Sequence, residues 1–400
     1  MTVLPINCKF NELSFDNKKN VYLHKNRKIM PRRLPTRIST CSLLLFLSFR
    51  AMAQWNYEIP FPKPLYADDT VTVSFIGDVM MHSRQLEYDC HDFLSGIGRI
   101  TRDADISVAN LEFTLAGPPY TGYPAFSSPD GYAACAADCG IDVFLTANNH
   151  ILDKGMSGLK RTLNVYEAMA DSCGIKYTGT AKDETSDKLL NPLMVVGHGI
   201  RLALVNFTYG TNMKPGEGWP KVKLMEKEEV ARMIDRARVK GADFIIALPH
   251  WGTEYRLRHS MEQEEWAEWL AGQGADLVIG AHPHVIQDTT HIGRVPVIYS
   301  MGNAVSNMSA ENTRLELAVL ARFVKHADGT MEMLEPQLEF MWCTLPGCLR
   351  DTYMTIPVKN YACRRDEWLD ASDYDNMMAT YERVIKETGI YEKDSKAGSR

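Results

Sequence analysis

Polar side chains capable of metal binding or catalysis follow short apolar runs at five places in the sequence. Each run has the length and composition of a buried strand, and the polar residue comes where that strand would end. In layered α/β proteins, sites form beyond the carboxyl ends of strands, because loops converge there. The residues at these positions are Asp78, Glu112, Asn149, His250, His282 and His284.

Carboxylate, amide oxygen and imidazole together suit a borderline or hard divalent ion such as Zn²⁺, Mn²⁺ or Fe²⁺. The set contains no cysteine, which argues against a purely structural zinc site. The segment His282-Pro283-His284 is the strongest local signal, since alternate residues of an extended chain face the same way. The other positions are weak when taken singly: His250 could be a hydrogen-bonded core residue, and Asp78 could be a helix N-cap. Their joint placement is what predicts a metal site.

The apolar runs alternate with amphipathic segments, which indicates a layered α/β fold. We expect strands at 71–76, 106–109, 143–146, 193–196, 202–206, 244–248, 277–279 and 295–299, and helices at 130–140, 155–173, 225–240 and 261–273. Later segments read as antiparallel strands at 315–323, 331–340 and 353–358, with a helix at 373–387. Because no linker rich in Pro, Gly or Ser intervenes, residues 306–400 should complete the same domain as residues 70–305.

The composition is that of an ordinary globular protein: 400 residues, of which 45% are apolar and 24% charged, with a formal net charge of −6. It excludes collagen-like and wholly disordered chains. Ten Lys/Arg and two Asp/Glu give residues 1–53 a net charge of +8, which leaves −14 for the remainder. A body this acidic repels phosphate backbones, so we expect no nucleic-acid partner.

The amino terminus has the pattern of a secretory signal peptide. Three arginines (Arg32, Arg33 and Arg37) precede the apolar run 42–49, and Ala51-Met52-Ala53 follows. We expect residues 1–53 to be a targeting segment, with translation starting at Met1 or Met30, and residues 54–69 to be a short leader. The protein would then be exported to the periplasm or cell envelope. The alternative is a mature extension with one apolar patch.

Export would permit disulfides. An odd number of cysteines follows residue 53, so at least one is free or pairs between chains: Cys90, Cys135, Cys139, Cys173, Cys343, Cys348 and Cys363. Cys343 and Cys348 flank a turn-like segment and could bridge. No spacing matches a zinc ribbon or a redox pair, so structural thiols or disulfides are the expectation.

The polar positions lie within longer motifs. These are Gly77-Asp78-Val79-Met80, Asn110-Leu111-Glu112, Ala147-Asn148-Asn149-His150, His250-Trp251-Gly252, Gly280-Ala281-His282-Pro283-His284 and Tyr299-Ser300-Met301-Gly302-Asn303. In this order the motifs resemble the CapA family of poly-γ-glutamate capsule synthesis proteins, which is similar to the calcineurin-like metallophosphoesterases. The resemblance implies an α/β fold of metallophosphoesterase type, a four-layer α-β-β-α sandwich, with a C-terminal strand-rich extension.

The resemblance also implies a site for one or two divalent ions. Its roles would be Asp78 and His284 on one ion, Asn149, His250 and His282 on the other, Glu112 bridging, and His150 as general acid. The chain departs from the phosphoesterase pattern in three places. Met80 stands where that pattern has a histidine, for which His82 could substitute; Glu112 is longer than the usual Asp; and Ile151 replaces an acidic residue.

These observations predict a metal-dependent hydrolase of a phosphoester or amide bond, with Arg84 and Asn303 binding substrate oxyanions. A surface ion pair explains Arg84 better than substrate binding does. The partners would be an anionic envelope polymer or its precursor and capsule-synthesis membrane proteins. A rival hypothesis is a non-enzymatic envelope component that guides the polymer and keeps its metal for stability. A weaker one is a carbohydrate-binding module using Trp251 and Trp266.

Overall fold

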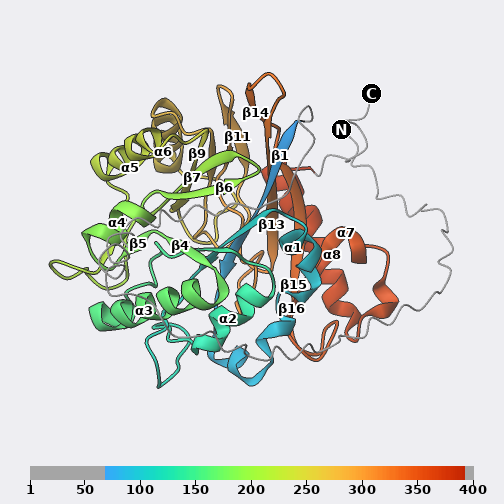
Figure 1. Ribbon diagram of the computed structural model, residues 1–400. Coiled ribbons are helices and arrows are strands. Elements are labelled where there is room, and N and C mark those ends of the chain that lie inside the picture. The colour runs from blue at the N-terminus through green and yellow to red at the C-terminus, as the bar shows by residue number, and fades with distance from the viewer. Residues whose placement is uncertain (1–67, 392–400) are drawn as a thin grey trace, which may run out of the picture. The chain divides into compact units, whose positions relative to one another are not determined.

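The computed structural model describes residues 68–391, so the predicted targeting segment 1–53 and most of the predicted leader lie outside it. One large sheet contains the first strand and the C-terminal strands (Figure 1). From edge to edge it runs through β16 (Met354–Pro357), β15 (Gln337–Thr344), β13 (Leu315–Lys325), β1 (Asp69–Val79), β2 (Ile106–Leu111), β3 (Val143–Leu145) and β4 (Lys176–Thr178), with β14 (Met331–Met333) paired to β13.

A second sheet has six strands in the order β11 (Thr289–Ile292), β12 (Val295–Ile298), β10 (Leu277–Ile279), β9 (Phe244–His250), β7 (Ile200–Thr208) and β6 (Leu193–Gly197). A small ribbon pairs β5 (Thr180–Ala181) with β8 (Lys221–Val222). The α-helices are α1 (Gly98–Arg102), α2 (Asp130–Asp138), α3 (Gly155–Cys173), α4 (Glu184–Leu190), α5 (Lys227–Val239), α6 (Met261–Gly272), α7 (Val358–Tyr361) and α8 (Ala371–Thr388). Short 3₁₀ turns are η1 (Ser83–Glu87), η2 (Cys90–Asp92), η3 (Ser95–Ile97) and η4 (Arg365–Glu367).

The two sheets face each other across a buried apolar layer. Val71 and Val73 of β1 belong to the same core cluster as Leu202 and Leu204 of β7. The residues of β7 that alternate with Leu202 and Leu204 point to the other face of the sheet. There Ala203 packs against α5 and α6. Helices α2 and α3 cover the outer face of the first sheet, and α8 packs on β13 and β15. This arrangement is the four-layer α-β-β-α sandwich that the sequence predicts.

Local sequence explains several element boundaries. The hairpin of β6 and β7 turns at His198 and Gly199, whose φ angles of 49° and 76° are left-handed. Helix α6 begins at the N-cap Ser260, whose side chain accepts from the backbone N–H of Gln263 in a capping box. Helix α3 ends at Gly174, with a φ of 77°. Each of these elements was expected from its sequence pattern.

Two expectations for the C-terminal part are wrong. The run 331–340 is not one strand: β14 ends at Met333 and β15 begins at Gln337, because Pro336 between them has no backbone N–H to donate. Cys343 and Cys348 do not bridge, and both are free thiols. Cys343 is buried on β15, and its Sγ lies 3.7 Å from the carbonyl oxygen of Ser306.

Strands from the last hundred residues sit inside the first sheet rather than beside it. β13 pairs antiparallel with β1, where Asp69 lies opposite Lys325. It also pairs antiparallel with β15, where Leu315 lies opposite Trp342. The strand that carries Asp78 therefore lies between β13 and β2. Among residues 68–391, no helix combines the length and apolar character that crossing a membrane would need.

Candidate metal centre

Both sheets deliver polar residues to one place at the carboxyl ends of their parallel strands. β1, β2 and β3 are parallel neighbours in the first sheet, as β9, β10 and β12 are in the second. Asp78 lies near the end of β1, and Glu112 directly follows β2. His250 is the last residue of β9, and His282 and His284 come just after β10.

These five side chains, which we call the His–carboxylate cluster, are all buried. They form two triads that share Glu112, and the ligand atoms within each triad lie within 4.8 Å of one another. One triad is Glu112, His282 and His284, and the other is Asp78, Glu112 and His250. This grouping differs from the partition between two ions that the resemblance implies, although Glu112 is central in both.

Glu112 Oε1 is the atom on which the cluster converges. It lies 3.7 Å from His250 Nε2 and 3.9 Å from both His284 Nε2 and His150 Nε2, and it has no hydrogen-bond partner among the described residues. His282 Nδ1 is likewise buried and unpartnered there. An orphaned buried polar atom is costly, so such atoms call for a ligand. Atoms that share one ion at about 2.0–2.2 Å lie about 3–4 Å apart, so the separations fit a divalent cation.

Burial and neighbouring charges shift the pKa values in the cluster. Desolvation lowers the pKa of His284, but its contacts with Asp78 and Asn303 outweigh this and raise it. Desolvation, together with nearby Asp78 and Glu254, raises the pKa of Glu112 well above its ordinary value. Desolvation lowers the pKa of His250, and with His284 and His150 nearby it lowers that of His282 to about 3. Neutral imidazoles with free lone pairs are the form that binds metals. A cation would relieve the crowding of carboxylates around Glu112.

A β-bulge aims Asp78 into the cluster. The register between β1 and β2 shifts between Ile76 and Asp78. Gly77 must lack a side chain here, because a Cβ would lie 2.1 Å from the carbonyl oxygen of Gly302. The Gly77 N–H donates to Oε1 of buried Glu316 at 2.6 Å, and the Asp78 N–H donates to the Gly302 oxygen at 3.0 Å. Glu316, from β13, thus stabilises the bulge by accepting the Gly77 hydrogen bond.

The two histidines of the His-Pro-His segment converge for a different reason from the one expected. The chain is not extended there: His282 has a φ of 98° and His284 a φ of 59°. Both values lie in the left-handed region that side chains other than glycine rarely occupy, at a cost of about 1–3 kcal/mol each. The His282 N–H donates to Asp78 Oδ2 at 3.2 Å, which helps to hold this conformation. Backbone strain at a site is a recurrent feature of functional centres.

His150 stands at the edge of the cluster with its own carboxylate. Its Nδ1 lies 2.7 Å from Asp153 Oδ2, and its Nε2 faces Glu112. Asn212 contacts the same pair, donating to Asp153 Oδ1 at 3.1 Å. Ile151 stands where the phosphoesterase pattern has an acidic residue, and Asp153 is the carboxylate that contacts His150 here. The signal was the i, i+3 spacing, which brings two side chains together within one turn of chain.

Two amides fix ligand imidazoles. Asn303 Oδ1 lies 2.9 Å from His284 Nδ1, and its Nδ2 donates to the carbonyl oxygens of His284 and Thr313. Asn303 is therefore a positioning residue for His284, and the substrate contact expected of it stays a prediction.

Asn149 Oδ1 lies 2.9 Å from His250 Nε2, so both atoms can face one ion. Asn110, which sequence reasoning missed, donates to Asp78 Oδ1 at 2.7 Å.

His82 and Arg84 behave differently from the main set. His82 Nδ1 accepts from the Asn307 N–H at 3.2 Å, and its ring packs edge-on against Phe126, 5.5 Å away. Desolvation lowers the pKa of His82 to about 4. His82 is thus beside the cluster but outside both triads. Arg84 is exposed on η1 and forms no hydrogen bond or ion pair with the described residues.

Two half-exposed tyrosines flank the cluster and were not anticipated. The Tyr209 ring lies 4.6 Å from that of His282, and the Tyr255 ring lies 6.2 Å from that of His284. Their exposed fractions of 46% and 45% place them where the buried cluster meets solvent. Tyr255 is held there by its backbone N–H, which donates to the Pro283 oxygen at 2.9 Å.

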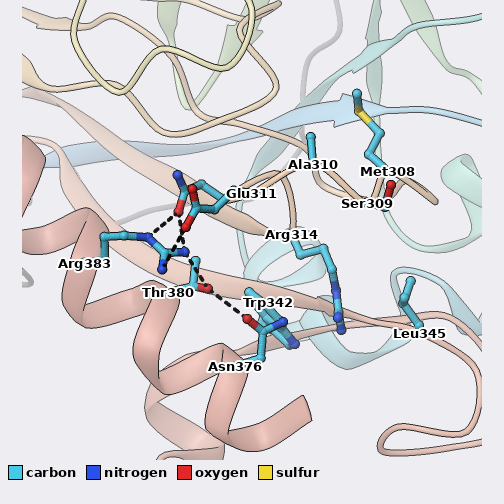
Figure 2. Close-up of a pocket in the computed structure, with 11 residues that line it drawn as sticks. Met308, Ser309, Ala310, Glu311, Arg314, Trp342, Leu345, Asn376, Thr380 and Arg383 are labelled. Atoms are coloured by element: carbon cyan, nitrogen blue, oxygen red, sulfur yellow. Dashed lines mark hydrogen bonds and ion pairs between the residues drawn. The ribbon is translucent and has the colours of Figure 1, made fainter. Parts of the chain in front are cut away.

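A cavity of about 400 Å³ lies elsewhere, between the loop 308–314, β15 and α8 (Figure 2). Its two arginines are already paired: Arg314 with Asp373 at 2.5 and 2.7 Å, and Arg383 with Asn312 at 3.0 and 2.8 Å. None of the predicted site residues lines it. The loop separates the two regions, since Asn303 contacts Thr313 and Met308 from the cluster side.

Comparison with known proteins places the chain in a family. The family described as "Bacterial capsule synthesis protein PGA_cap" matches residues 72–308. The chain is 26% identical over 341 residues to "PGA biosynthesis protein CapA" of Bacillus subtilis (strain 168), covering 80% of this chain and 85% of that one. It is 24% identical to "Capsule biosynthesis protein CapA" of Bacillus anthracis, covering 80% and 79%.

Among solved structures, the chain aligns with the NAD nucleotidase of Haemophilus influenzae at a TM-score of 0.44 and 13% identity, covering 80% of this chain and 67% of that one. It also aligns with a 5'-nucleotidase from Candida albicans at a TM-score of 0.39 and 12% identity, covering 80% and 59%. The matched segment 72–308 contains the His–carboxylate cluster, His150 and Asn303. The chain belongs to the bacterial capsule synthesis protein family PGA_cap.

Proposed function

We propose that this protein is a metal-dependent hydrolase that cleaves a phosphoester or a related bond, such as an amide, during synthesis of a capsule or other cell-envelope polymer. The relatives from Bacillus are named for PGA and capsule biosynthesis, which supports an envelope polymer such as poly-γ-glutamate, or its precursor, as the substrate. A capsule-synthesis system at the membrane is the proposed partner.

One observation carries the proposal: a buried carboxylate oxygen of Glu112 lies 3.7 and 3.9 Å from the imidazole nitrogens of two proposed ligands, His250 and His284, and has no hydrogen-bond partner among the described residues. Purely structural histidines and carboxylates in a core pair with each other at hydrogen-bond distance. Here the imidazole nitrogens stand beyond hydrogen-bond distance from the Glu112 oxygen. These nitrogen and oxygen donors suit Mn²⁺, Zn²⁺ or Fe²⁺. The ligands would be Asp78, Glu112, Asn149, His250, His282 and His284.

Divalent ions held there would supply Lewis acidity, lowering the pKa of water toward about 7 and withdrawing charge from the electrophile. The chain's own residues do the rest. His150, oriented through Nδ1 by Asp153, presents Nε2 toward the cluster and can donate a proton to a leaving group. Asn303 keeps the His284 ring in place, and Tyr209 and Tyr255 shape the entrance.

Metal analysis followed by assay tests the proposal. Purified wild-type protein should contain one or two equivalents of Mn, Zn or Fe by mass spectrometry, and His282→Ala should lose most of it. His291→Ala is the matched control, because His291 lies on β11, away from the cluster, and pairs with Glu335. Wild type with added Mn²⁺ should hydrolyse an aryl phosphate or a γ-glutamyl amide. Bound metal without turnover over both substrate classes would overturn the hydrolase and leave a binding role.

We also propose that the chain is exported. The basic, apolar and A-x-A segments at 32–53 support this, as does the Cys90–Cys135 disulfide, a bond that persists in oxidising compartments. A fusion of this chain to a reporter enzyme that is active only outside the cytoplasm should be active. Deletion of residues 42–49 should abolish that activity, and equal activity of both fusions would contradict export.

A further inference from the structure

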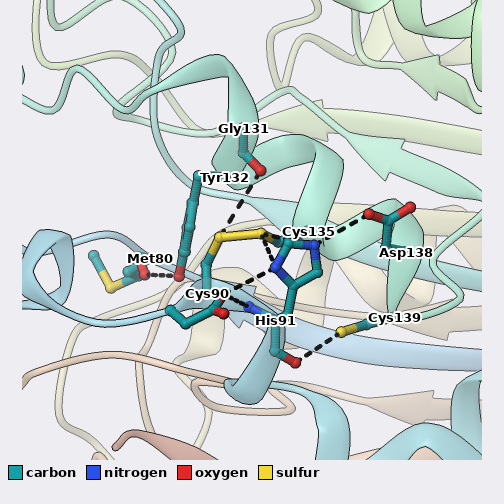
Figure 3. Close-up of a disulfide and its surroundings, with 9 residues drawn as sticks. Met80, Cys90, His91, Gly131, Tyr132, Cys135, Asp138 and Cys139 are labelled. Atoms are coloured by element: carbon teal, nitrogen blue, oxygen red, sulfur yellow. Dashed lines mark hydrogen bonds and ion pairs between the residues drawn. A yellow bond between two sulfur atoms is a disulfide. The ribbon is translucent and has the colours of Figure 1, made fainter.

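A second group of metal-binding side chains lies on the helical layer, outside the His–carboxylate cluster. Asp89, Cys90, His91 and Cys135 each offer one ligand atom, and these atoms lie within 4.8 Å of one another. We call them the Cys–His cluster. Cys90 and His91 are in η2, Asp89 is its N-cap, and Cys135 is on α2 (Figure 3). In the structure Cys90 and Cys135 form a disulfide.

We propose that the Cys–His cluster is a zinc site that exists only while the Cys90–Cys135 bond is reduced. A dithiol or two monothiols reduce the S–S bond and are themselves oxidised to a disulfide, which leaves two cysteine thiols. Binding of Zn²⁺ then displaces one proton from each thiol, so the ion is held by two thiolates, His91 and Asp89. A disulfide in solution reverses the process: the two thiolates transfer two electrons to it, it is reduced to two thiols, the Cys90–Cys135 bond forms, and Zn²⁺ is released.

The distances around His91 suit tetrahedral zinc. With Zn–S near 2.3 Å and Zn–N near 2.0–2.1 Å, sulfur and nitrogen ligands of one ion stand about 3.5 Å apart. Cys135 Sγ lies 3.5 Å from His91 Nδ1 and 3.7 Å from Nε2. Asp89 Oδ1 lies 2.9 Å from His91 Nδ1 and also accepts from the His91 backbone N–H at 3.0 Å. The His91, Asp89 and Cys135 side chains therefore lie close together, and cleavage of the disulfide frees both sulfurs to move toward the Nδ1 side of the ring.

The other side of the imidazole has the support that metal-bound histidines commonly have. Asp138 Oδ2 lies 3.2 Å from His91 Nε2. When Nδ1 binds a metal, Nε2 carries the proton and donates it to such a carboxylate, which fixes the ring and strengthens the ligand. Cys139 is not a ligand, because its Sγ donates to the His91 carbonyl oxygen at 3.6 Å. Asp138 therefore supports the imidazole ring, and Cys139 contacts only the backbone, so neither is a ligand.

Cobalt spectroscopy tests this site separately from the His–carboxylate cluster. Full-length protein is reduced with a phosphine, freed of reductant without oxygen, and titrated with Co²⁺. We expect the near-ultraviolet thiolate-to-cobalt absorption to appear as Co²⁺ is added, to vanish on adding Zn²⁺, and to be absent from oxidised protein. The His–carboxylate cluster contains no sulfur, so it cannot give this band. Loss of metal from that cluster would refute the proposed function without affecting this result.

Variants complete the test. Cys90→Ser should abolish the band, and His91→Ala should weaken zinc binding by more than the about 10–100-fold that loss of a supporting residue costs. Cys173→Ser is the control, because Cys173 is an exposed free thiol, and it should bind like wild type. His91 is largely exposed, so oxidised His91→Ala should melt like wild type and remain interpretable. A band that persists in Cys90→Ser, or reduced wild type without the band, would overturn the proposal.

Discussion

The two clusters share imidazole and carboxylate donors, although only the Cys–His cluster contains sulfur, and they lie in opposite surroundings. In the His–carboxylate cluster every side chain is buried, comes from a strand end, and Glu112 Oε1 is left without a hydrogen bond among the described residues. In the Cys–His cluster the side chains of His91 and Asp89 are 57% and 69% exposed, come from short helical elements, and are hydrogen-bonded to each other. The first therefore needs a cation to balance buried charge, whereas the second is already satisfied by its disulfide and its carboxylates.

The difference shows why burial, rather than donor type, decides how strongly a site depends on its ion. Buried polar atoms without partners carry a desolvation cost that a bound ion removes. Exposed groups exchange water for metal and gain less. Substitutions in the His–carboxylate cluster should thus have large effects on both metal and activity, and equivalent ones in the Cys–His cluster small effects.

The largest effect is expected for Glu112→Gln, which keeps the shape but removes the charge shared by both triads. Metal should be lost from both, and hydrolysis should fall by more than the about 10²–10⁴-fold that one positioned acid contributes. Metal-free Glu112→Gln should be at least as stable as metal-free wild type, because the neutral amide avoids burying a carboxylate.

Elemental analysis, kinetics and thermal melts measure these quantities. Glu184→Gln is the control, since Glu184 pairs with Lys188 on the exposed face of α4. A Glu112→Gln protein that keeps its full metal content would show that the shared carboxylate is not a ligand.

His150→Ala should separate proton transfer from metal binding. His150 lies at the edge of the cluster and faces Glu112 at 3.9 Å, so its loss should leave the metal content near that of wild type. Activity should fall about 10²–10⁴-fold for substrates with poor leaving groups, and much less for aryl phosphates, whose leaving groups need no proton. Equal losses for both substrate types would argue against a role as general acid.

Sequence patterns predicted the strand ends well, because each depends on a local run of residues. The β-branched run before Asp78 and the apolar run ending at His250 are strands for reasons visible within ten residues. The same holds for the order of motifs that indicated the family. Local patterns therefore predict the strands and the polar residues at their carboxyl ends.

The remaining features depend on distant contacts or on backbone conformations that no local pattern reveals. Cys90 and Cys135 are 45 residues apart in sequence and meet only because η2 packs on α2. The Asn303 side chain contacts both His284, 19 residues away in sequence, and the Thr313 carbonyl oxygen. The left-handed conformation of His282 contradicts the extended chain that alternation predicted. Tertiary packing imposes each of these features.

Removing the disulfide should affect stability but not the His–carboxylate cluster. Cross-linking residues 45 apart stabilises a fold by about 2–4 kcal/mol in the chain-entropy account. The double variant Cys90→Ser/Cys135→Ser should lose about that much free energy of unfolding in urea, with unchanged metal content and Cys173→Ser as control. Loss of metal as well would show that η2 and α2 support the cluster, for which Tyr132 is the structural route, since its hydroxyl donates to the Met80 oxygen at 2.8 Å (Figure 3).

Asn303→Ala tests the support of a ligand inside the buried site. Without the amide, His284 Nδ1 loses its 2.9 Å partner and the ring can rotate away. Loss of such supporting residues typically lowers metal affinity or activity about 10–100-fold. Asn376→Ala is the control, because Asn376 is exposed on α8 and makes no contact with the cluster. Metal affinity equal to wild type would remove Asn303 from the site's architecture.

Asp138→Asn is the matching change at the exposed site and should have the smallest effect. Asp138 supports His91 Nε2 as Asn303 supports His284, but its side chain is 67% exposed. Exposed charge pairs contribute about 0.2–1 kcal/mol, so zinc affinity of the reduced protein should fall by at most about fivefold. Competition with a chromophoric chelator measures it, and Asp235→Asn, which breaks the exposed pair with Arg238, is the control. If Asp138→Asn instead costs as much as Asn303→Ala, water does not weaken the contact around His91. Burial would then not be what separates the two clusters.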